Sequence, residues 1–317
     1  MFAFKNLFQA GSATIPGAPT ILSATAGVES VTVVFDPPTF NGGLPITSYT
    51  VTASPGGTTA SSASTSIVVS GLTAGQSYTF TVTATNAIGT GPSSNPSSSA
   101  TPTEPGDPYW SSVGALFHFN GNFTDSSGNC SLSDQGGCDI ATSTVKYGSG
   151  SLRYGSYASF SAPSAVRFGT GDFTIEFWLY VGSNAYTEAA FVTIGDPRTS
   201  GGWSVFTDNG RGVLLYANSG YVTSGNSSCV PNTNAWNFYA ITRQGTTLRV
   251  YKNGSLAETG STSLNFDGAY MEMGRLWNGN TYQPNTSYRL DELRLTKGVA
   301  RYTGSTMTVP SAAFKDY

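Results

Sequence analysis

The sequence contains little charge and few catalytic or metal-binding side chains. Charged residues make up 10% of its 317 residues, against roughly 25% in an average soluble protein. Long solvated helices depend on Glu, Lys, Arg and Ala, so this deficit disfavours a helical fold. With a net charge of −3, no basic excess is left for phosphates, and we expect no nucleic-acid partner. No apolar run reaches the ~18 residues of a spanning helix, so we expect no membrane partner.

The scarcity of histidine and cysteine restricts catalysis and metal binding. His118 is the single histidine, so any histidine-based triad would depend on it. It lies between two phenylalanines, which favours a structural role. The three cysteines, Cys130, Cys138 and Cys229, fit no zinc-ligand spacing. Cys130 and Cys138 are close in a Gly-rich loop, so we predict a disulfide between them, with the reduced pair as the alternative.

The abundant residues are those of β-structure. The chain has 38 glycines, 17 tyrosines and 18 phenylalanines, and serine and threonine are plentiful throughout. Aromatic and β-branched residues favour strands, and glycine favours the turns between them. The length is enough for about two domains. We therefore expect an all-β protein with two sandwich domains.

The first fifteen residues form a short apolar segment. Its large side chains are Phe2, Phe4, Leu7 and Phe8, and polar residues interrupt the apolar run that a signal peptide requires. We predict that residues 1–15 are an anchor that becomes ordered against a partner protein. A frayed terminus is the alternative.

Residues 16–103 predict a small β-sandwich. Val31–Phe35, Ile46–Ala53, Ser66–Val69 and Tyr78–Ala84 are apolar stretches, several with strict alternation, separated by Pro- and Gly-rich turns. Ser93–Pro108 is dense in proline and serine, which indicates a semi-rigid connection whose residues 104–108 form the linker.

This first segment resembles a fibronectin type III domain. The residues that carry the resemblance are Pro19, Phe35, Pro37–Pro38, Tyr49, Val51, Gly71–Leu72, Tyr78, Thr83–Ala84, Asn86, Gly89 and Gly91–Ser93. The Leu72 and Tyr78 pair looks like the tyrosine corner of that family, whereas Phe35 stands where tryptophan is usual. Glu29 and Asp36 are the only charged residues between 16 and 103, so we expect a spacer or docking module rather than a ligand-binding one.

Residues 109–317 predict a larger sandwich of about a dozen strands, of jelly-roll type. They resemble the concanavalin A-like lectin/glucanase superfamily in its laminin-G-like branch. The carrying segments are Leu116–Gly128, Gly148–Leu152, Asp172–Trp178, Trp236–Arg243, Leu248–Gly254 and Leu290–Tyr302, followed by Pro310 and Phe314. The segment Thr296–Tyr302 looks like that of virion proteins from tailed bacteriophages. Asn120 departs from the family, which often has aspartate there.

No catalytic motif is present in this segment. Glucanases of the superfamily use two carboxylates in an E-x-D-x-x-E strand, and this chain lacks that pattern. Glu176 is followed two residues later by Trp178 instead. Asp291 and Glu292 are adjacent, so a regular strand would direct them to opposite faces. We expect that the protein is not an enzyme.

Two ligand sites are predicted, each with a structural alternative. A sugar site needs exposed aromatic rings beside hydrogen-bonding groups, and the candidates are Trp277, Tyr282, Asn278, Asn280 and Arg275, with Trp203 as a weaker one. The alternative is that the tryptophans are core residues. A calcium site would use the oxygens of Asp125, Asn129, Asp291 and Glu292. The alternative is that Asp125 and Asn129 make turn hydrogen bonds. No other cofactor is expected.

The layout predicts a protein held at one end and displayed at the other. We expect a structural protein on the exterior of a bacteriophage virion, assembled in the host cytoplasm. It would be a capsid decoration or head fibre, or a short tail fibre that contacts host surface polysaccharide. Its partners would be other capsid or tail proteins, in an oligomer or multicopy assembly. The alternative is a secreted bacterial carbohydrate-binding or glycan-degrading protein, which the absence of a signal peptide disfavours.

Overall fold

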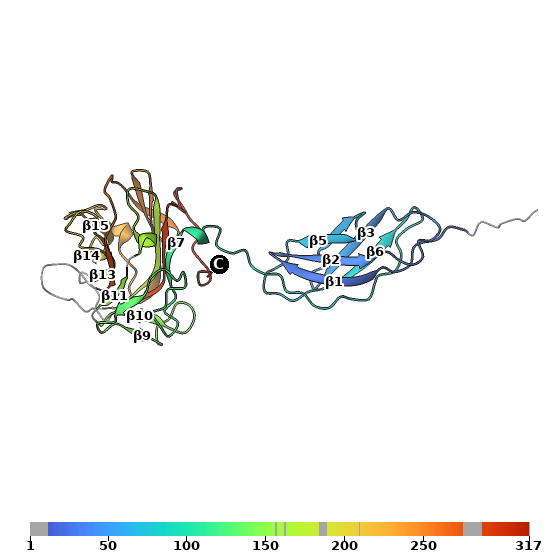
Figure 1. Ribbon diagram of the computed structural model, residues 1–317, viewed down its shortest axis with the longest axis horizontal. Coiled ribbons are helices and arrows are strands. Elements are labelled where there is room, and N and C mark those ends of the chain that lie inside the picture. Colours follow the sequence, from blue (N-terminus) through green and yellow to red (C-terminus); the bar gives the residue numbers. More distant parts are fainter. Residues whose placement is uncertain are drawn as a thin grey trace, which may run out of the picture. The chain divides into compact units, whose positions relative to one another are not determined.

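The computed structural model describes residues 12–155, 157–161, 163–183, 189–208, 210–274 and 287–316. The chain divides into two compact units, Met1–Pro105 and Gly106–Tyr317, and strands dominate both (Figure 1). The described residues contain only three short 3₁₀-helices, Trp110–Ser112, Ser164–Val166 and Ser227–Cys229. Within those same ranges no helix is long and apolar enough to cross a membrane. The all-β prediction is confirmed.

The first unit is a sandwich of two three-stranded sheets. Its strands are β1 (Thr20–Gly27), β2 (Ser30–Asp36), β3 (Ser48–Ser54), β4 (Thr59–Ser62), β5 (Ser66–Ser70) and β6 (Thr79–Thr85). One sheet has the order β1-β2-β5 and the other β4-β3-β6. The alternation seen in the sequence directs Val31, Val33 and Phe35 of β2 into the core. Phe35 meets Tyr49 edge-on at 5.0 Å between ring centroids, so phenylalanine fills the position usually held by tryptophan.

The tyrosine corner is confirmed. The hydroxyl of Tyr78 accepts a hydrogen bond from the backbone N–H of Thr73 at 3.1 Å and donates to Oε1 of Gln76 at 3.2 Å. Leu72 is buried beside Tyr78 in the same core. These bonds fix the turn that leads into β6.

The Pro- and Ser-rich stretch is more structured than the sequence predicts. The backbone N–H groups of Ser94, Ser97 and Ala100 donate to carbonyl oxygens of the β6 region at 2.9 Å each, so this segment lines the sheet edge. Asp107, predicted in the linker, belongs to the second unit, where it is buried between two arginines. The prediction of a linker over 104–108 is therefore wrong at its C-terminal end, because a buried ion pair holds that residue.

The second unit is a sandwich of an eight-stranded and a seven-stranded sheet (Figure 1). The eight-stranded sheet has the order β19-β18-β17-β12-β21-β10-β9, with β7 paired to β21, and the other has the order β16-β15-β14-β13-β20-β11-β8. The strands are β7 (Val113–Phe117), β8 (Leu132–Asp134), β9 (Asp139–Ala141), β10 (Ser151–Arg153), β11 (Ala158–Ser161), β12 (Phe173–Val181), β13 (Ala189–Ile194), β14 (Trp203–Asp208), β15 (Gly212–Ala217), β16 (Gly220–Tyr221), β17 (Ala235–Gln244), β18 (Thr247–Lys252), β19 (Ser255–Ser261), β20 (Tyr270–Met273) and β21 (Tyr288–Lys297).

Both faces of the eight-stranded sheet are buried along its central strands β12 and β21. Alternation along β12 places Phe173, Ile175 and Phe177 in the core between the sheets. Its opposite face, which includes Trp178, packs in a second apolar cluster with Phe314 and other residues of the segment 299–316. This C-terminal segment therefore covers the outer face of the sheet, which explains why polar residues of β12 and β21 are also buried.

A β-bulge in β21 changes where two carboxylates point. Leu290 and Leu293 both lie in the core between the sheets, three residues apart, and the pairing of β12 with β21 shifts register at this place. Glu292 has φ of +53°, in the left-handed region, and is the extra residue that β21 inserts opposite β12 at this bulge. Asp291 and Glu292 therefore lie on the same, outer face. The prediction of opposite faces is wrong, because it assumed a regular strand.

Candidate functional site

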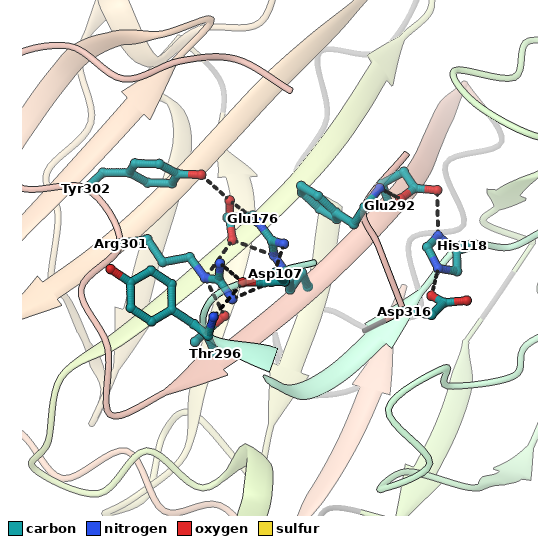
Figure 2. Close-up of polar contacts among 11 residues, drawn as sticks. Asp107, His118, Glu176, Glu292, Thr296, Arg301, Tyr302 and Asp316 are labelled. Atoms are coloured by element: carbon teal, nitrogen blue, oxygen red, sulfur yellow. Dashed lines mark hydrogen bonds and ion pairs between the residues drawn. The ribbon is translucent and has the colours of Figure 1, made fainter. Parts of the chain in front are cut away.

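Two polar clusters occupy the outer face of the eight-stranded sheet (Figure 2). In the first, Arg294 of β21 donates through Nε and Nη2 to both oxygens of Glu176 at 2.8 and 2.9 Å. Arg294 and Arg301 both reach the carboxylate of Asp107, each at 2.8 Å. Tyr302 donates its hydroxyl hydrogen to Glu176 at 2.6 Å. These charged groups are almost completely buried and satisfy one another, so the cluster joins three chain segments.

The pKa values of groups in this cluster are shifted by burial and by their partners within the cluster. Burial, aided by the charge of Glu176, raises the pKa of Tyr302 well above its ordinary value. Burial opposes ionisation of Asp107, but hydrogen bonds from Arg301 and the charge of Arg294 lower its pKa overall. The Thr296–Tyr302 block, the most specific part of the family resemblance, is thus part of the scaffold. Its residues hold the C-terminal segment in place.

The second cluster is centred on His118 (Figure 2). Its Nδ1 lies 2.8 Å from Glu292 and its Nε2 lies 2.5 Å from Asp316. Burial alone would lower the pKa of His118, but hydrogen bonds and charge from both carboxylates raise it to about 9. The imidazole is therefore a cation at neutral pH. Glu292 also accepts the backbone N–H of Phe314 at 2.6 Å, so the cluster clamps the C-terminal segment and offers no general base.

Asp125, one of the predicted calcium ligands, organises a turn. Backbone N–H groups of Leu116, Ser127, Asn129 and Cys130 donate to its carboxylate at distances between 2.7 and 3.0 Å. The Ser127 hydroxyl lies 2.8 Å from both of its oxygens. The side chain of Asn129 donates to the carbonyl of Val113 at 3.3 Å. Asp125 and Asn129 thus make turn hydrogen bonds, which was the alternative to the predicted calcium site. These bonds leave the Asp125 oxygens few free lone pairs for a cation.

Asp291 and Glu292, the other two predicted calcium ligands, have separate protein partners. Asp291 accepts backbone N–H groups of Lys146 and Tyr147 at 3.0 and 3.2 Å, and burial raises its pKa to about 7. Glu292 is occupied by His118 and Phe314. Across the described ranges, no group of three or more His, Cys, Asp or Glu residues could hold a metal ion. The four residues do not form one ligand set in the described structure.

The predicted disulfide is not formed. All three cysteines are buried, and none of them is in a disulfide. Cys130 and Cys138 both belong to the core between the sheets, where they pack as small apolar side chains. Burial, aided by the charge of Asp125, raises the pKa of Cys130 to about 12. The disulfide prediction considered only the short loop and took no account of this burial.

Trp203 is wrong as a sugar-binding candidate. Its side chain is 0% exposed and stacks on Phe168 with 5.4 Å between ring centroids. The main predicted sugar site lies outside the described residues, which do not include 275–286. Its residues are Arg275, Trp277, Asn278, Asn280 and Tyr282. The predicted anchor residues Phe2, Phe4, Leu7 and Phe8 also lie outside them, because the description begins at residue 12.

A pocket of about 760 Å³ opens at one side of the second unit. β8 ends the seven-stranded sheet and β9 ends the eight-stranded one, and Leu132 of β8 and Ile140 of β9 both line the pocket. The remaining lining residues come from the turn-rich loop and the connection between those strands: Gly121, Asn122, Phe123, Thr124, Asp125, Gly128, Cys130, Ser131 and Gln135. The pocket therefore lies beside an edge strand of each sheet.

The pocket has an apolar wall and an uncharged polar rim. Phe123 is half-buried and packs edge-on to Phe119 with 6.4 Å between ring centroids, while Leu132 is exposed. Asn122, Thr124 and Gln135 supply amide and hydroxyl groups. Asp125, the one charged residue among the described lining residues, is buried and saturated by N–H donors. An apolar surface beside a few neutral hydrogen-bonding groups is typical of small-molecule sites.

The sequence contained only a weak signal for this pocket. The loop Asn120–Asn129 is recognisable as turn-rich, and Gly121 and Gly128 adopt φ of +88° and +74° there. What creates the pocket is the approach of β8 and β9, two strands of three residues each. Such short strands give no periodic pattern that could be read in advance.

A second group of aromatic residues is less suited to ligand binding. Tyr221 is exposed at the end of the seven-stranded sheet, but its ring stacks on Phe206 at 6.1 Å. The Arg211 guanidinium lies 4.8 Å from the centroid of the same ring, and Asp208 lies 3.4 Å from Arg211. Protein groups thus already occupy the ring surface that a sugar would need.

The two units match two protein-family models. Residues 17–100 match the fibronectin type III domain, and residues 154–300 match the concanavalin A-like lectin/glucanases superfamily. The chain therefore carries a fibronectin type III domain followed by a concanavalin A-like domain. No curated protein matches the chain.

Several solved structures are similar to parts of the chain. The binding domain of botulinum neurotoxin serotype D is 14% identical with a TM-score of 0.46, over 60% of this chain and 49% of that one. Domain 4 of AbnA, a GH43 extracellular arabinanase from Geobacillus stearothermophilus in complex with arabinotriose, is 16% identical with a TM-score of 0.43, over 59% and 93%. The twitchin kinase region from C. elegans is 28% identical with a TM-score of 0.26, over 28% and 17%. The chain spans about half the length of the neurotoxin domain.

Proposed function

We propose that this protein is a non-catalytic carbohydrate-binding protein displayed on the outside of a bacteriophage particle. The observation that carries the carbohydrate part is the pocket beside β8 and β9. It places a half-buried ring, Phe123, and the exposed Leu132 next to the neutral polar groups of Asn122, Thr124 and Gln135. Sugars present apolar C–H faces and many hydroxyl groups, and such a surface complements both.

The carboxylates support a binding role rather than hydrolysis. Glycoside hydrolysis needs two carboxyl groups that flank the substrate bond. Glu176 is bound to Arg294, and Asp291 accepts a backbone N–H group from Lys146. Glu292 accepts the backbone N–H of Phe314 in the C-terminal segment. Asp125 is the single carboxylate that lines the pocket in the described part of the chain, and backbone N–H groups saturate it. The pocket therefore lacks the acid and nucleophile pair.

The first unit serves as a spacer in this proposal. Residues 16–103 contain only Glu29 and Asp36 as charged residues, so the unit makes few ion pairs with a partner. The particle attachment is assigned to residues 1–15, whose large apolar side chains suit a groove on a capsid or tail protein. The virion assignment itself depends on the bacteriophage-like form of Thr296–Tyr302.

Two measurements test the proposal. The intact chain is applied to an array of bacterial surface polysaccharides, where we expect binding that Leu132→Asp removes. Binding that this change leaves intact would move the site away from the pocket. Absence of binding to every polysaccharide would overturn the carbohydrate part.

Particle location is tested separately by quantitative mass spectrometry of purified phage particles. Hundreds of copies per particle would indicate capsid decoration, and a few dozen or fewer would indicate a tail or vertex position with host adhesion. If the chain is missing from particles, the virion assignment is wrong and a secreted bacterial binding protein replaces it.

A further inference from the structure

We infer that the pocket beside β8 and β9 selects neutral sugars that carry an acetamido group. This inference rests on the proposed carbohydrate function and specifies its ligand class. Three features of the pocket support it: its electrostatics, its apolar wall and its unpaired amide atoms.

The charges around the pocket disfavour acidic ligands. Among the described residues, no lysine or arginine lines it, and the one charged lining residue is Asp125 with its carboxylate. The adjacent strands add Asp134 and Asp139, of which Asp139 is paired with Arg153. An anionic sugar such as a uronic or sialic acid would meet negative charge without a basic partner. A neutral ligand avoids this cost.

The apolar wall of the pocket favours a ligand that carries a methyl group. Phe123 and Ile140 are half-buried, Cys130 is buried, and the Leu132 side chain is 41% exposed beside them. Hydroxyl groups placed against such a wall would lose their hydrogen bonds with water. A methyl group gains from the same contact by leaving water. The acetamido group supplies such a methyl group on an otherwise polar ring.

The rim offers one acceptor and one donor that have no partner among the described residues. Nε2 of Gln135 donates to the carbonyl of Cys138 at 2.8 Å, which leaves Oε1 of that amide as an acceptor. Oδ1 of Asn122 accepts the backbone N–H of Thr124 at 2.9 Å, which leaves Nδ2 as a donor. An acetamido group has one N–H donor and one carbonyl acceptor, the two types of group that this acceptor and this donor can bind.

The test uses NMR titration of the intact chain with N-acetylglucosamine and N-acetylgalactosamine, compared with glucose, galactose and N-acetylneuraminic acid. We expect saturable shifts with at least one of the two acetamido sugars, and binding at least tenfold weaker for the parent hexoses and the anionic sugar. Gln135→Leu should weaken binding of the acetamido sugar about tenfold, the effect of one hydrogen bond. Leu132→Asp should abolish it. The matched control is Val68→Asp in the first unit, where the original side chain is 52% exposed, and it should leave binding unchanged.

The outcomes separate the inference from the proposed function. Equal binding of glucose or galactose and their acetamido counterparts, or tighter binding of N-acetylneuraminic acid, overturns the acetamido inference and leaves a carbohydrate site in place. Acetamido binding that persists in both pocket variants also overturns it, because the ligand then binds elsewhere. If no monosaccharide binds while polysaccharides bind on the array, the acetamido selectivity is wrong but the function stands. If neither binds, both fail.

Discussion

The buried ion cluster around Arg294 gives a prediction of large magnitude. Replacing Arg294 with methionine keeps an unbranched side chain but removes the guanidinium, whose carbon lies 3.8 Å from the centroid of the Phe314 ring. The change removes both hydrogen bonds to Glu176, which is fully buried. Loss of one partner of a buried ion pair costs about 3–5 kcal/mol. Arg301 remains 3.5 Å from Glu176, so we expect the lower end, about 3 kcal/mol.

Tryptophan fluorescence during urea unfolding can measure this loss for the second unit alone. All five tryptophans of the chain lie in that unit, so their signal is independent of the first unit. A matched control is Arg153→Met, which breaks the exposed, solvent-screened pair with Asp139 and should leave the urea midpoint almost unchanged. Adding Glu176→Gln to Arg294→Met should recover part of the loss, because the uncompensated charge is gone. A loss below ~1 kcal/mol for Arg294→Met alone would refute the reasoning.

Three other predictions follow from buried titratable groups. The pKa of His118 is raised from 6.5 to about 9. The protonated side chain therefore contributes fully to the free energy of unfolding below pH ~6.5, and this contribution disappears as pH rises through 9. Urea midpoints of the second unit should fall over that range, and His118→Gln should remove this fall; parallel profiles would contradict it. The pKa of Asp291 is raised to about 7, so ionisation destabilises the fold as pH rises through 7. Asp291→Asn should then stabilise the unit at pH 8 more than at pH 5. Because all three cysteines are buried thiols, Ellman's reagent should titrate three in urea without reductant and almost none in the native protein. A count of one in urea would show a disulfide.

The fold was predictable because apolar side chains alternate along several strands. Val31, Val33 and Phe35 alternate into the core of the first unit, and Phe173, Ile175 and Phe177 do so in the second. Such alternation is visible in the sequence without any knowledge of strand partners.

The details of the site could not be predicted because they depend on partners distant in sequence. The bulge at Glu292 is visible only from its backbone conformation and from the pairing of β21 with β12. Asp107 looks like a linker residue until Arg294 and Arg301 are placed beside it. The sequence around Trp203 does not show whether its ring is buried or exposed to a sugar. Only its packing against Phe168 and Phe266 in the structure shows that the ring is buried.

The position of β21 in the sheet also determines the order in which the chain can fold during synthesis. This strand pairs with β12, β10 and β7, yet it spans only residues 288–297. Until the ribosome has released it, those three strands lack their common neighbour and expose unpaired edges. The first unit, which needs none of these residues, can form its own core much earlier. The second unit must therefore fold late and through contacts between distant segments, which makes its folding slow and sensitive to truncation after residue 287.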